Sequence, residues 1–350
     1  MTHGGDPGGA GAIPGDRARE VSVVRVRGSV GCARSDLLTV EEPLEIRVCQ
    51  AGAAVDEERS VAVTMRTPGH DFELAAGFLY SEGFYRRPED LLGVRHCGHE
   101  GNVVRATLSA TPNGIAPGAL LERGVDARGS RLVANSSCGV CGKASIEDVL
   151  ATLPAPVAQT AERAASPAVA APILHRLPAE LRRHQRTFAQ TGGLHAAALF
   201  DAAGTLRLLR EDVGRHNALD KLIGRAVLEA RLPQQDAVVL FSGRTGFELV
   251  QKAACAGVRF LAAVGAPSSL ACDLAAELGI TLVGFLRDGR FNIYAGAQRV
   301  TGVSQAAGDP AGARLEVKAV SETGAATAPT QPTVRPVAAG SARTGSRSAP

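Results

Sequence analysis

The chain has 350 residues, a formal net charge of +3 and 45% hydrophobic residues. This length is enough to bury a substantial core and predicts about two domains. The mild charge, with no Lys/Arg-rich run and no aromatic stacking surface, argues against nucleic-acid binding. No apolar run approaches a membrane span, and the glycine-rich start has no apolar signal core, which predicts a cytoplasmic protein.

Both ends of the chain differ in composition from its middle. Residues 1–18 and 303–350 are rich in Gly, Ala, Pro, Ser and Thr and show no hydrophobic periodicity. Such segments cannot bury enough apolar surface to offset the entropy lost on ordering. We therefore expect both to be disordered tails.

Short runs in which apolar and polar residues alternate occur in residues 19–131 and predict a small β-rich N-terminal domain. The runs are typical of strands and cover Val21–Val26, Leu44–Val48, Ser60–Thr64 and Val103–Leu108. One helix interrupts them at Asp71–Tyr80, where apolar residues recur at helical spacing and acids occupy the first turn.

In residues 132–302 the pattern changes to strands that alternate with helices, which predicts an α/β domain. Ser145 can cap a short helix through Leu150, residues 153–172 are Ala/Pro-rich and irregular, and Pro178 at a helix start leads into Glu180–Ala189. A hairpin follows, then alternating elements: strands 194–200, 205–209, 236–241, 258–264, 280–285 and 290–294, and helices 216–230, 246–256 and 268–278. This alternation predicts a largely parallel sheet.

The loop at residues 135–143 concentrates reactive sulfur. Cys138 and Cys141 lie three positions apart, between glycines and close to Lys143. The glycines allow a tight, uncovered turn, and a nearby cation and helix start favour the thiolate. The loop is expected to expose two reactive thiols.

Three other roles for this loop lack their partners. Structural zinc needs four ligands, and only Cys97 with His96 and His99 could weakly complete them. A thioredoxin-like pair would follow the first strand of a βαβ unit, whereas this loop follows a β-rich segment. A zinc deaminase needs P-C-x-x-C with an upstream H-x-E, whereas Ser137 precedes Cys138 and no H-x-E occurs. A persulfide relay, which needs only thiolates, remains.

Polar clusters follow several predicted strands of the α/β domain, where ligands bind in open sheets. His195, after paired glycines, is either a general base or a satisfied core histidine, and the second reading is slightly favoured. Glu211–Asn217 compresses two acids, Arg215, His216 and an amide into one turn, which favours function over simple capping.

Two further turns carry arginine. The glycine-rich turn Ser242–Gly246 precedes a helix and contains Arg244, which predicts an anion site although no P-loop pattern is present. Glu248 and Lys252 on the helix that follows are expected to form a surface pair. Phe285–Arg290 places two arginines around a turn that suits a phosphate or carboxylate, although for this segment taken alone an ordinary basic hairpin turn is the favoured interpretation.

Taken together, these segments resemble the formate dehydrogenase accessory sulfurtransferases, the FdhD family. The resemblance covers most of residues 20–302 in order and rests on Arg66–Leu79, Ser136–Gly142, Thr191–His195, Glu211–Lys221, Ser242–Arg244 and Phe285–Tyr294. It implies a three-layer α/β sandwich similar to the cytidine deaminase fold.

The resemblance also implies an activity. Family members are sulfur carriers that take sulfur from a cysteine desulfurase as a persulfide. They pass it to the molybdenum cofactor, in its bis(molybdopterin guanine dinucleotide) form, before that cofactor enters formate dehydrogenase. The implied partners are the desulfurase, formate dehydrogenase and a second copy of the chain. The molybdenum cofactor would be a transient substrate, with no permanent cofactor and no metal.

Residue roles follow from the same resemblance. Cys138 would bear the persulfide with Cys141 assisting, and the cofactor would contact Phe285, Leu286, Arg287, Asp288, Gly289 and Arg290. The other turns add His195, Arg215, His216, Ser242, Gly243 and Arg244 as candidate contacts. The four arginines at 215, 244, 287 and 290 suit phosphates, and Glu211 or Asp212 could pair with a guanine edge. A cofactor chaperone without sulfur transfer and a zinc hydrolase stay as alternatives.

Overall fold

The computed structural model describes residues 17–52, 58–97, 101–110 and 167–304. All of these except Ser304 fall within one compact unit, Met1–Val303. The cysteine loop, the helix expected at residues 145–150, the expected domain boundary near residue 131 and almost all of both tails lie outside the described residues. The domain division therefore stays a prediction.

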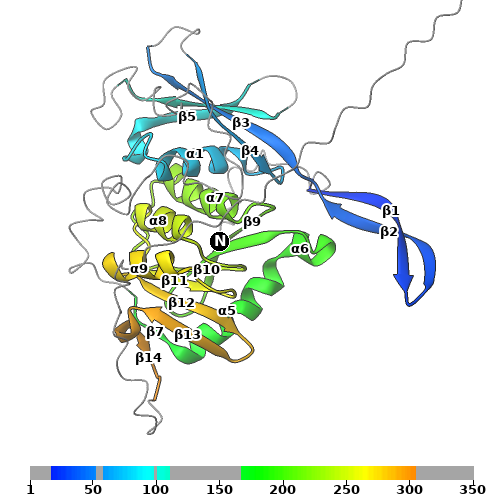
Figure 1. Cartoon of the computed structure of the whole chain (residues 1–350). Helices are drawn as coiled ribbons and strands as arrows, with labels where there is room; N and C mark the ends of the chain where they lie inside the picture. Colours follow the sequence, from blue (N-terminus) through cyan, green and yellow to red (C-terminus); the bar gives the residue numbers. More distant parts are fainter. Residues whose placement is uncertain (1–16, 53–57, 98–100, 111–166, 305–350) are drawn as a thin grey trace, which may run out of the picture. The chain divides into compact units, whose positions relative to one another are not determined.

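A six-stranded sheet forms the centre of the described α/β part (Figure 1). Its strand order is β13-β12-β11-β10-β8-β9. The strands are β8 (His195–Phe200), β9 (Leu206–Asp212), β10 (Val238–Phe241), β11 (Phe260–Ala263), β12 (Thr281–Arg287) and β13 (Arg290–Ala295). Each strand predicted after residue 193 is confirmed.

The expectation of a largely parallel sheet is wrong. Only the central strands β10, β11 and β12 run parallel, while β13, β8 and β9 pair antiparallel with their neighbours. The β8–β9 and β12–β13 connections are short turns, and a short turn can join only antiparallel strands.

Helices cover both faces of this sheet, in agreement with an α/β sandwich. Alternation along β10 sends Val238 and Leu240 to one face and Val239 and Phe241 to the other. The first face packs against α5 (Ala171–His184), and the second against α7 (Arg215–Leu228), α8 (Phe247–Cys255) and α9 (Ser269–Glu277). The likeness to the cytidine deaminase fold stays a prediction.

Helix α5 corrects the predicted start at Pro178. The helix begins at Ala171 with Pro172 in its first turn, and Pro178 lies inside it. Leu174, Leu177 and Leu181 are buried along one face, so packing against the sheet outweighs the loss of one backbone donor at Pro178. Helix α5 ends at His184, and after Gln185 the chain continues as a second helix, α6 (Arg186–Thr191).

A second sheet, of order β4-β3-β6-β5, lies in the N-terminal part. Its strands β3 (Glu42–Gln50), β4 (Arg59–Arg66) and β6 (Val103–Leu108) contain three predicted runs, whereas β5 (Leu91–His96) was not predicted. Helix α1 (Asp71–Ser81), predicted almost to the residue, packs against α7. The two helices approach so closely that a Cβ at Gly77 would lie 1.8 Å from the Asp220 carbonyl oxygen.

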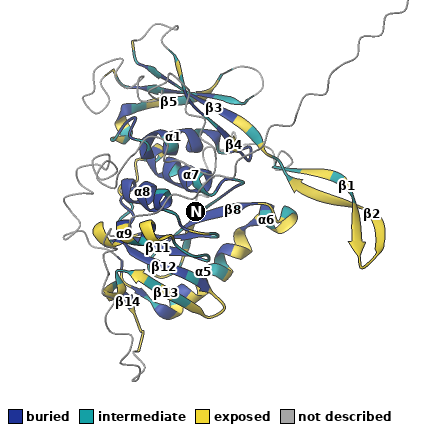
Figure 2. Ribbon diagram, in the orientation of Figure 1, coloured by how far each residue is buried: buried dark blue, intermediate teal, exposed yellow. Residues whose placement is uncertain are grey.

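Strands β1 (Ala18–Arg27) and β2 (Val30–Thr39) form a hairpin arm that lies outside both hydrophobic clusters. Most of its side chains are exposed, including Val24 at 70% and Val30 at 72% (Figure 2). At its base, Thr39 Oγ1 donates to Thr191 Oγ1 at 2.8 Å. The sequence predicted β1 but not β2, whose polar and small residues mask the alternation.

None of the described helices is both long and apolar enough to cross a membrane.

Candidate functional site

The polar clusters predicted at strand ends meet at one edge of the central sheet. The parallel strands β10, β11 and β12 end there. Because β8 runs antiparallel to β10 and pairs with β9, the start of β8 at His195 and the end of β9 at Asp212 reach the same edge. The clusters therefore share one edge of the sheet, which is the place where open sheets bind ligands.

A pocket of about 710 Å³ opens at this edge. Its walls come from α5, α6, the Gly192–His195 segment and the ends of β10, β11 and β12. The volume falls in the range of small-molecule and cofactor sites. The pocket brings together these predicted site residues: His195, Ser242, Arg287 and Asp288.

His195 stands at the first position of β8 and is half-buried. Burial, and then the nearby positive charge of Arg215, lower the pKa of its imidazole. A neutral ring can donate one hydrogen bond and accept another. The ring lies close over the backbone, because a Cβ at Gly243 would be 3.2 Å from its Nδ1.

The Ser242–Gly246 turn connects β10 to α8. Ser242 Oγ accepts a hydrogen bond from the Ala196 amide at 2.8 Å, which ties this turn to β8. Gly265 lies against the turn, and its amide donates to the Gly243 carbonyl at 3.0 Å. Arg244 is exposed beside the turn, so its guanidinium is open to an anion.

The Phe285–Arg290 segment comprises the end of β12, a tight turn at Asp288-Gly289 and the first residue of β13. Asp288 and Gly289 both have positive φ, 54° and 70°, as a two-residue hairpin turn requires. Phe285 has φ 53°, a left-handed conformation that is costly for a bulky residue and common at functional sites. Arg287, Asp288, Gly289 and Arg290 are exposed, whereas Leu286 is fully buried in the core.

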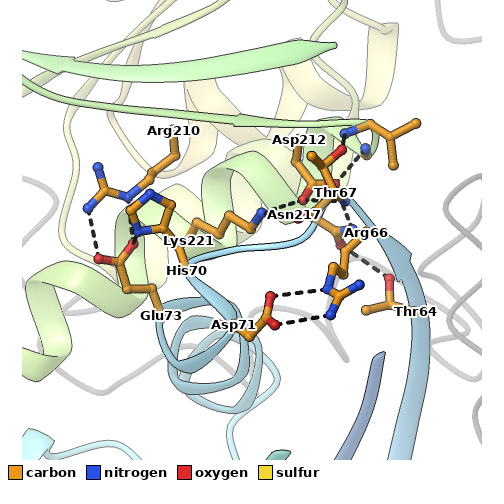
Figure 3. A network of polar contacts seen from close by, with 12 residues as sticks. Thr64, Arg66, Thr67, His70, Asp71, Glu73, Arg210, Asp212, Asn217 and Lys221 are labelled. Atoms are coloured by element: carbon orange, nitrogen blue, oxygen red, sulfur yellow. Dashed lines mark hydrogen bonds and ion pairs between the residues drawn. The ribbon is translucent and has the colours of Figure 1, made fainter. Parts of the chain in front are cut away.

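A network of buried polar contacts supports the turn that carries Arg215 and His216 (Figure 3). Asp212 is fully buried and pairs with Lys221 at 2.6 Å. Its carboxylate also accepts from the Gly214 amide at 2.8 Å and from the Asn217 side chain at 3.0 Å. Lys221 in turn donates to the Thr67 carbonyl at 2.9 Å, so the network joins α7 to the turn that precedes α1.

The predicted pairing of Glu211 or Asp212 with a guanine edge is not supported, because internal donors bind both carboxylates. Glu211 is 7% exposed and accepts from the amides of Thr187 and Phe188, at 3.1 and 2.9 Å. It thereby caps the N-terminus of α6 from a distant strand. The cluster of polar residues at 211–217 is therefore largely structural, and Arg215 and His216 are its members closest to solvent.

The expected surface pair of Glu248 and Lys252 is wrong. Lys252 is 7% exposed and binds Asp220 at 3.0 Å and Glu82 at 3.1 Å. Glu248 instead pairs with His216, whose Nε2 lies 2.9 Å from the carboxylate. Helical spacing brought the two residues to neighbouring positions, but the packing of α8 against α1 and α7 gave each a partner elsewhere.

Cys138 and Cys141 lie outside the described residues, so their roles remain predictions. Within the part of the chain that the structure describes, no group of three or more His, Cys, Asp or Glu side chains is placed to hold a metal ion.

The chain matches a known protein family over most of its length. The model of the family described as FdhD/NarQ matches residues 39–301. The chain belongs to the FdhD/NarQ family. This confirms the resemblance seen in the sequence, and the match begins at the end of the hairpin arm.

Relatives of this FdhD/NarQ chain share one description, "Sulfur carrier protein FdhD". One from Streptomyces coelicolor is 49% identical over 285 residues, covering 79% of this chain and 94% of that protein. Another from Sulfurisphaera tokodaii is 40% identical over 284 residues, covering 81% and 99%.

A crystal structure from Desulfotalea psychrophila, whose description proposes a formate dehydrogenase accessory protein, shows the same fold. It superimposes with a TM-score of 0.59 at 21% identity and covers 81% of this chain and 99% of that one. At this identity the likeness supports the fold alone.

Several pocket residues of the FdhD/NarQ chain were not predicted from its sequence. They come from the break between α5 and α6: Arg182, Gln185 and Phe188. Gly192 and Gly193, the paired glycines that precede His195, also line the pocket. The sequence signal was weak because this helix was expected to start at Pro178 and to run through Gln185 without a break.

Proposed function

We propose that this FdhD/NarQ chain is a sulfur carrier for formate dehydrogenase maturation. It would accept sulfur from a cysteine desulfurase as a persulfide on Cys138 and deliver it to the bis(molybdopterin guanine dinucleotide) form of the molybdenum cofactor. The observation that carries the proposal is the description of relatives 40–49% identical over most of the chain as sulfur carrier proteins. The C-x-x-C motif supplies the sulfur chemistry.

The uptake step is a thiol–persulfide exchange. The Cys138 thiolate would attack the outer sulfur of the desulfurase persulfide, forming a new S–S bond. The old S–S bond breaks, and the desulfurase cysteine leaves as a thiolate. No net oxidation occurs, and the rate depends on the fraction of Cys138 that is thiolate.

The delivery step needs two electrons, which the second thiol can provide. Attack of the Cys141 thiolate on the Cys138 sulfur would form a Cys138–Cys141 disulfide and release the outer sulfur as sulfide to the acceptor. The outer sulfur is reduced, and the two cysteines are oxidised. A dithiol reductant would then restore the pair.

The acceptor side of the proposal is supported by the sheet edge. A pocket of about 710 Å³ with Arg287 in its wall, and exposed Arg244 and Arg290 on neighbouring turns, suits a ligand with a flat base and several phosphates. In this proposal the chain's own residues bind and orient the cofactor, while its molybdenum receives the sulfur.

Intact mass spectrometry tests the carrier role. After incubation with a cysteine desulfurase and cysteine, the full chain should gain the mass of one sulfur atom, and a reductant should remove it. Cys138→Ala should gain none. Cys32→Ala is the matched control, because Cys32 is an exposed thiol on the hairpin arm and should not matter. Sulfur uptake by Cys138→Ala together with full activation of formate dehydrogenase would exclude Cys138 as the carrier.

The Cys138→Ala variant also distinguishes the sulfur carrier from the second candidate function, a cofactor chaperone without sulfur transfer. A chaperone that only delivers the cofactor would keep both cofactor binding and formate dehydrogenase activation in Cys138→Ala.

A further inference from the structure

The hairpin arm, strands β1 and β2, exposes apolar side chains that the core does not use. Val24 is 70% exposed, Val26 61% and Val30 72%, and neither hydrophobic cluster of the described residues contains them (Figure 2). The arm is a two-stranded ribbon, and such a ribbon is marginally stable at best without further packing. Its free strand edges are also templates for contact with another chain. The arm therefore has the properties of an interaction surface.

One face of the arm is apolar from the middle of the hairpin towards its tip. Directly paired residues of antiparallel strands share a face of the ribbon. Val24 pairs with Ala33. Val26 lies on the same face, because side chains alternate along a strand, and it pairs with Gly31. These two pairs present no charge, so this face fits an apolar strip on a partner.

The opposite face of the same part of the arm is basic. Residues 23–34 contain no acidic side chain and three arginines, Arg25, Arg27 and Arg34. All three are exposed, and the register places them on the face opposite to the two valines. A guanidinium binds a carboxylate through two parallel hydrogen bonds, and arginine is enriched at protein interfaces. The arm therefore fits a partner that has carboxylates beside its apolar strip.

The base of the arm touches the wall of the pocket at the sheet edge. Thr39, the last residue of β2, donates a hydrogen bond to Thr191 of α6 at 2.8 Å, and β2 packs against this helix. Gly193 lines the pocket, and a Cβ there would lie 2.9 Å from Thr39 Oγ1. A protein that receives the contents of the pocket must approach its mouth. Such a protein comes to the place where the arm begins.

The helices at this base continue the positive charge. Arg182 and Arg183 at the end of α5, and Arg186 at the start of α6, are exposed. Residues 181–192 contain no acidic side chain. A dimer through this face would be isologous and would bring the same arginines together, and like charges across an interface are costly. The charge therefore favours an acidic partner protein over a second copy of the chain.

We propose that the hairpin arm docks the acidic protein that receives the contents of the pocket. The inference rests on the proposed function, in which this recipient is the catalytic subunit of formate dehydrogenase. The valine face packs against an apolar strip of the subunit, and the three arginines bind carboxylates beside it. The family model begins at residue 39, where the arm ends. The arm is thus suited to select one recipient, whereas the pocket belongs to the part that the family shares.

Biolayer interferometry with the purified full chain and the purified catalytic subunit of formate dehydrogenase, free of its cofactor, tests the apolar face. Val24→Thr/Val26→Thr keeps β-branched side chains, so the hairpin is retained. It places hydroxyl groups in the apolar contact and should weaken binding about tenfold or more. Val303→Thr is the matched control, because Val303 is 54% exposed but lies outside the arm. It should leave binding unchanged.

The basic face is tested by charge reversal in the same assay. Arg27→Glu should weaken binding about tenfold, and wild-type binding should weaken as the salt concentration rises. Arg59→Glu is the matched control, since Arg59 is an exposed arginine on β4 and its reversal changes the net charge equally. Binding that is insensitive both to Arg27→Glu and to salt would exclude an acidic partner surface.

Two further measurements separate docking of the recipient from other uses of the arm. Sulfur uptake from the cysteine desulfurase, followed by mass, should be equal in Val24→Thr/Val26→Thr and the wild type. Sedimentation equilibrium should give both the same molar mass. The thermal midpoint should also be unchanged, because both valines lie outside the hydrophobic clusters.

Several results would overturn the proposal. The first two are no binding of the subunit by the wild type, and binding by Val24→Thr/Val26→Thr as tight as that of the wild type. Loss of sulfur uptake in this variant would assign the arm to the desulfurase, and a lower molar mass would assign it to a second copy. Loss of wild-type binding to phosphatidylglycerol vesicles would assign it to a membrane. A wild-type chain that takes up no sulfur would count against the proposed function and leave the docking result to stand on its own.

Discussion

Lys252 and Asp220 form a buried ion pair between helices α8 and α7. The Lys252 ammonium lies 3.0 Å from Asp220, 3.1 Å from Glu82 and 2.7 Å from the Ser81 hydroxyl. Burial acts to lower the pKa of Lys252, but the two carboxylates outweigh it and raise the pKa. Lys252 therefore keeps its charge. Each buried charge of the pair is compensated only while its partner is present.

Removal of this lysine should strongly destabilise the fold. Lys252→Met leaves the Asp220 carboxylate buried without its cation, and we expect a loss of about 3–5 kcal/mol in the free energy of unfolding, measured in urea. Neutralising the carboxylate as well, in Lys252→Met/Asp220→Asn, should recover part of this loss. A single variant as stable as the wild type would show that water reaches Asp220.

Glu73 should make stability depend on pH in the acidic range. Burial acts to raise its pKa, but hydrogen bonds from Arg210 and His70 lower it from 4.5 to about 2. Because the folded-state pKa is depressed, the stabilisation is present above pH 4.5 and is lost as pH falls towards 2. It amounts to about 3 kcal/mol at neutral pH.

Glu73→Gln isolates this contribution. The variant should be less stable than the wild type at pH 7, and the difference should shrink as pH falls from 5 to about 2. Urea unfolding at several pH values measures it. A difference that stays constant over this range would mean that the ionisation of Glu73 does not contribute.

At the scale of elements, the crossing of α1 and α7 joins the N-terminal sheet to the α/β part. Two glycines allow it. A Cβ at Gly77 would lie 1.8 Å from the Asp220 carbonyl oxygen, and one at Gly224 would lie 1.8 Å from the Glu73 carbonyl oxygen. These neighbours are backbone atoms of the facing helix, so they cannot move aside without separating the helices.

Gly77→Ala and Gly224→Ala should each destabilise the fold by about 2 kcal/mol or more, despite the better helix propensity of alanine. Gly93→Ala is the matched control, because a Cβ there would meet nothing within 4 Å. Thermal unfolding should show a lower midpoint for the two helix variants and little change for the control. Equal midpoints would show that α1 and α7 can separate at no cost.

The elements of the α/β part could be predicted because their periodicity is local. The strands and helices after residue 193 were placed to within a few residues, and turns such as Asp288-Gly289 marked their ends. The direction of β8 and β9 in the sheet and the break at Gln185 depend on packing between distant segments. No local pattern encodes such contacts.

The candidate site was predictable in the same uneven way. Arginine and glycine turns after strands located the sheet edge correctly. The internal use of Glu211 and Asp212 was not predictable, because a buried carboxylate that caps a distant helix has the same sequence appearance as one that awaits a ligand.

At the scale of the whole molecule, the hydrophobic core of the described residues lies between Leu44 and Val300. Both hydrophobic clusters draw their buried residues from these positions. The hairpin arm, β1 and β2, lies outside both clusters. The family match also stops at residues 39 and 301.

A chain trimmed to residues 39–304 should therefore keep the fold and the pocket. We expect one cooperative thermal transition with a midpoint within a few degrees of the full chain, because the buried apolar surface that stabilises the fold is retained. The pocket should also be retained, since the described residues that line it lie between Pro178 and Asp288. The trimmed end keeps Val300 and Thr301, which pair with Val169 and Ala170. A further cut that removes Val300 is the informative comparison, because it deletes this pairing and a buried side chain and should lower the midpoint. If trimming to residues 39–304 alone lowers the midpoint as much, the arm or the C-terminal segment contributes to the stability of the core.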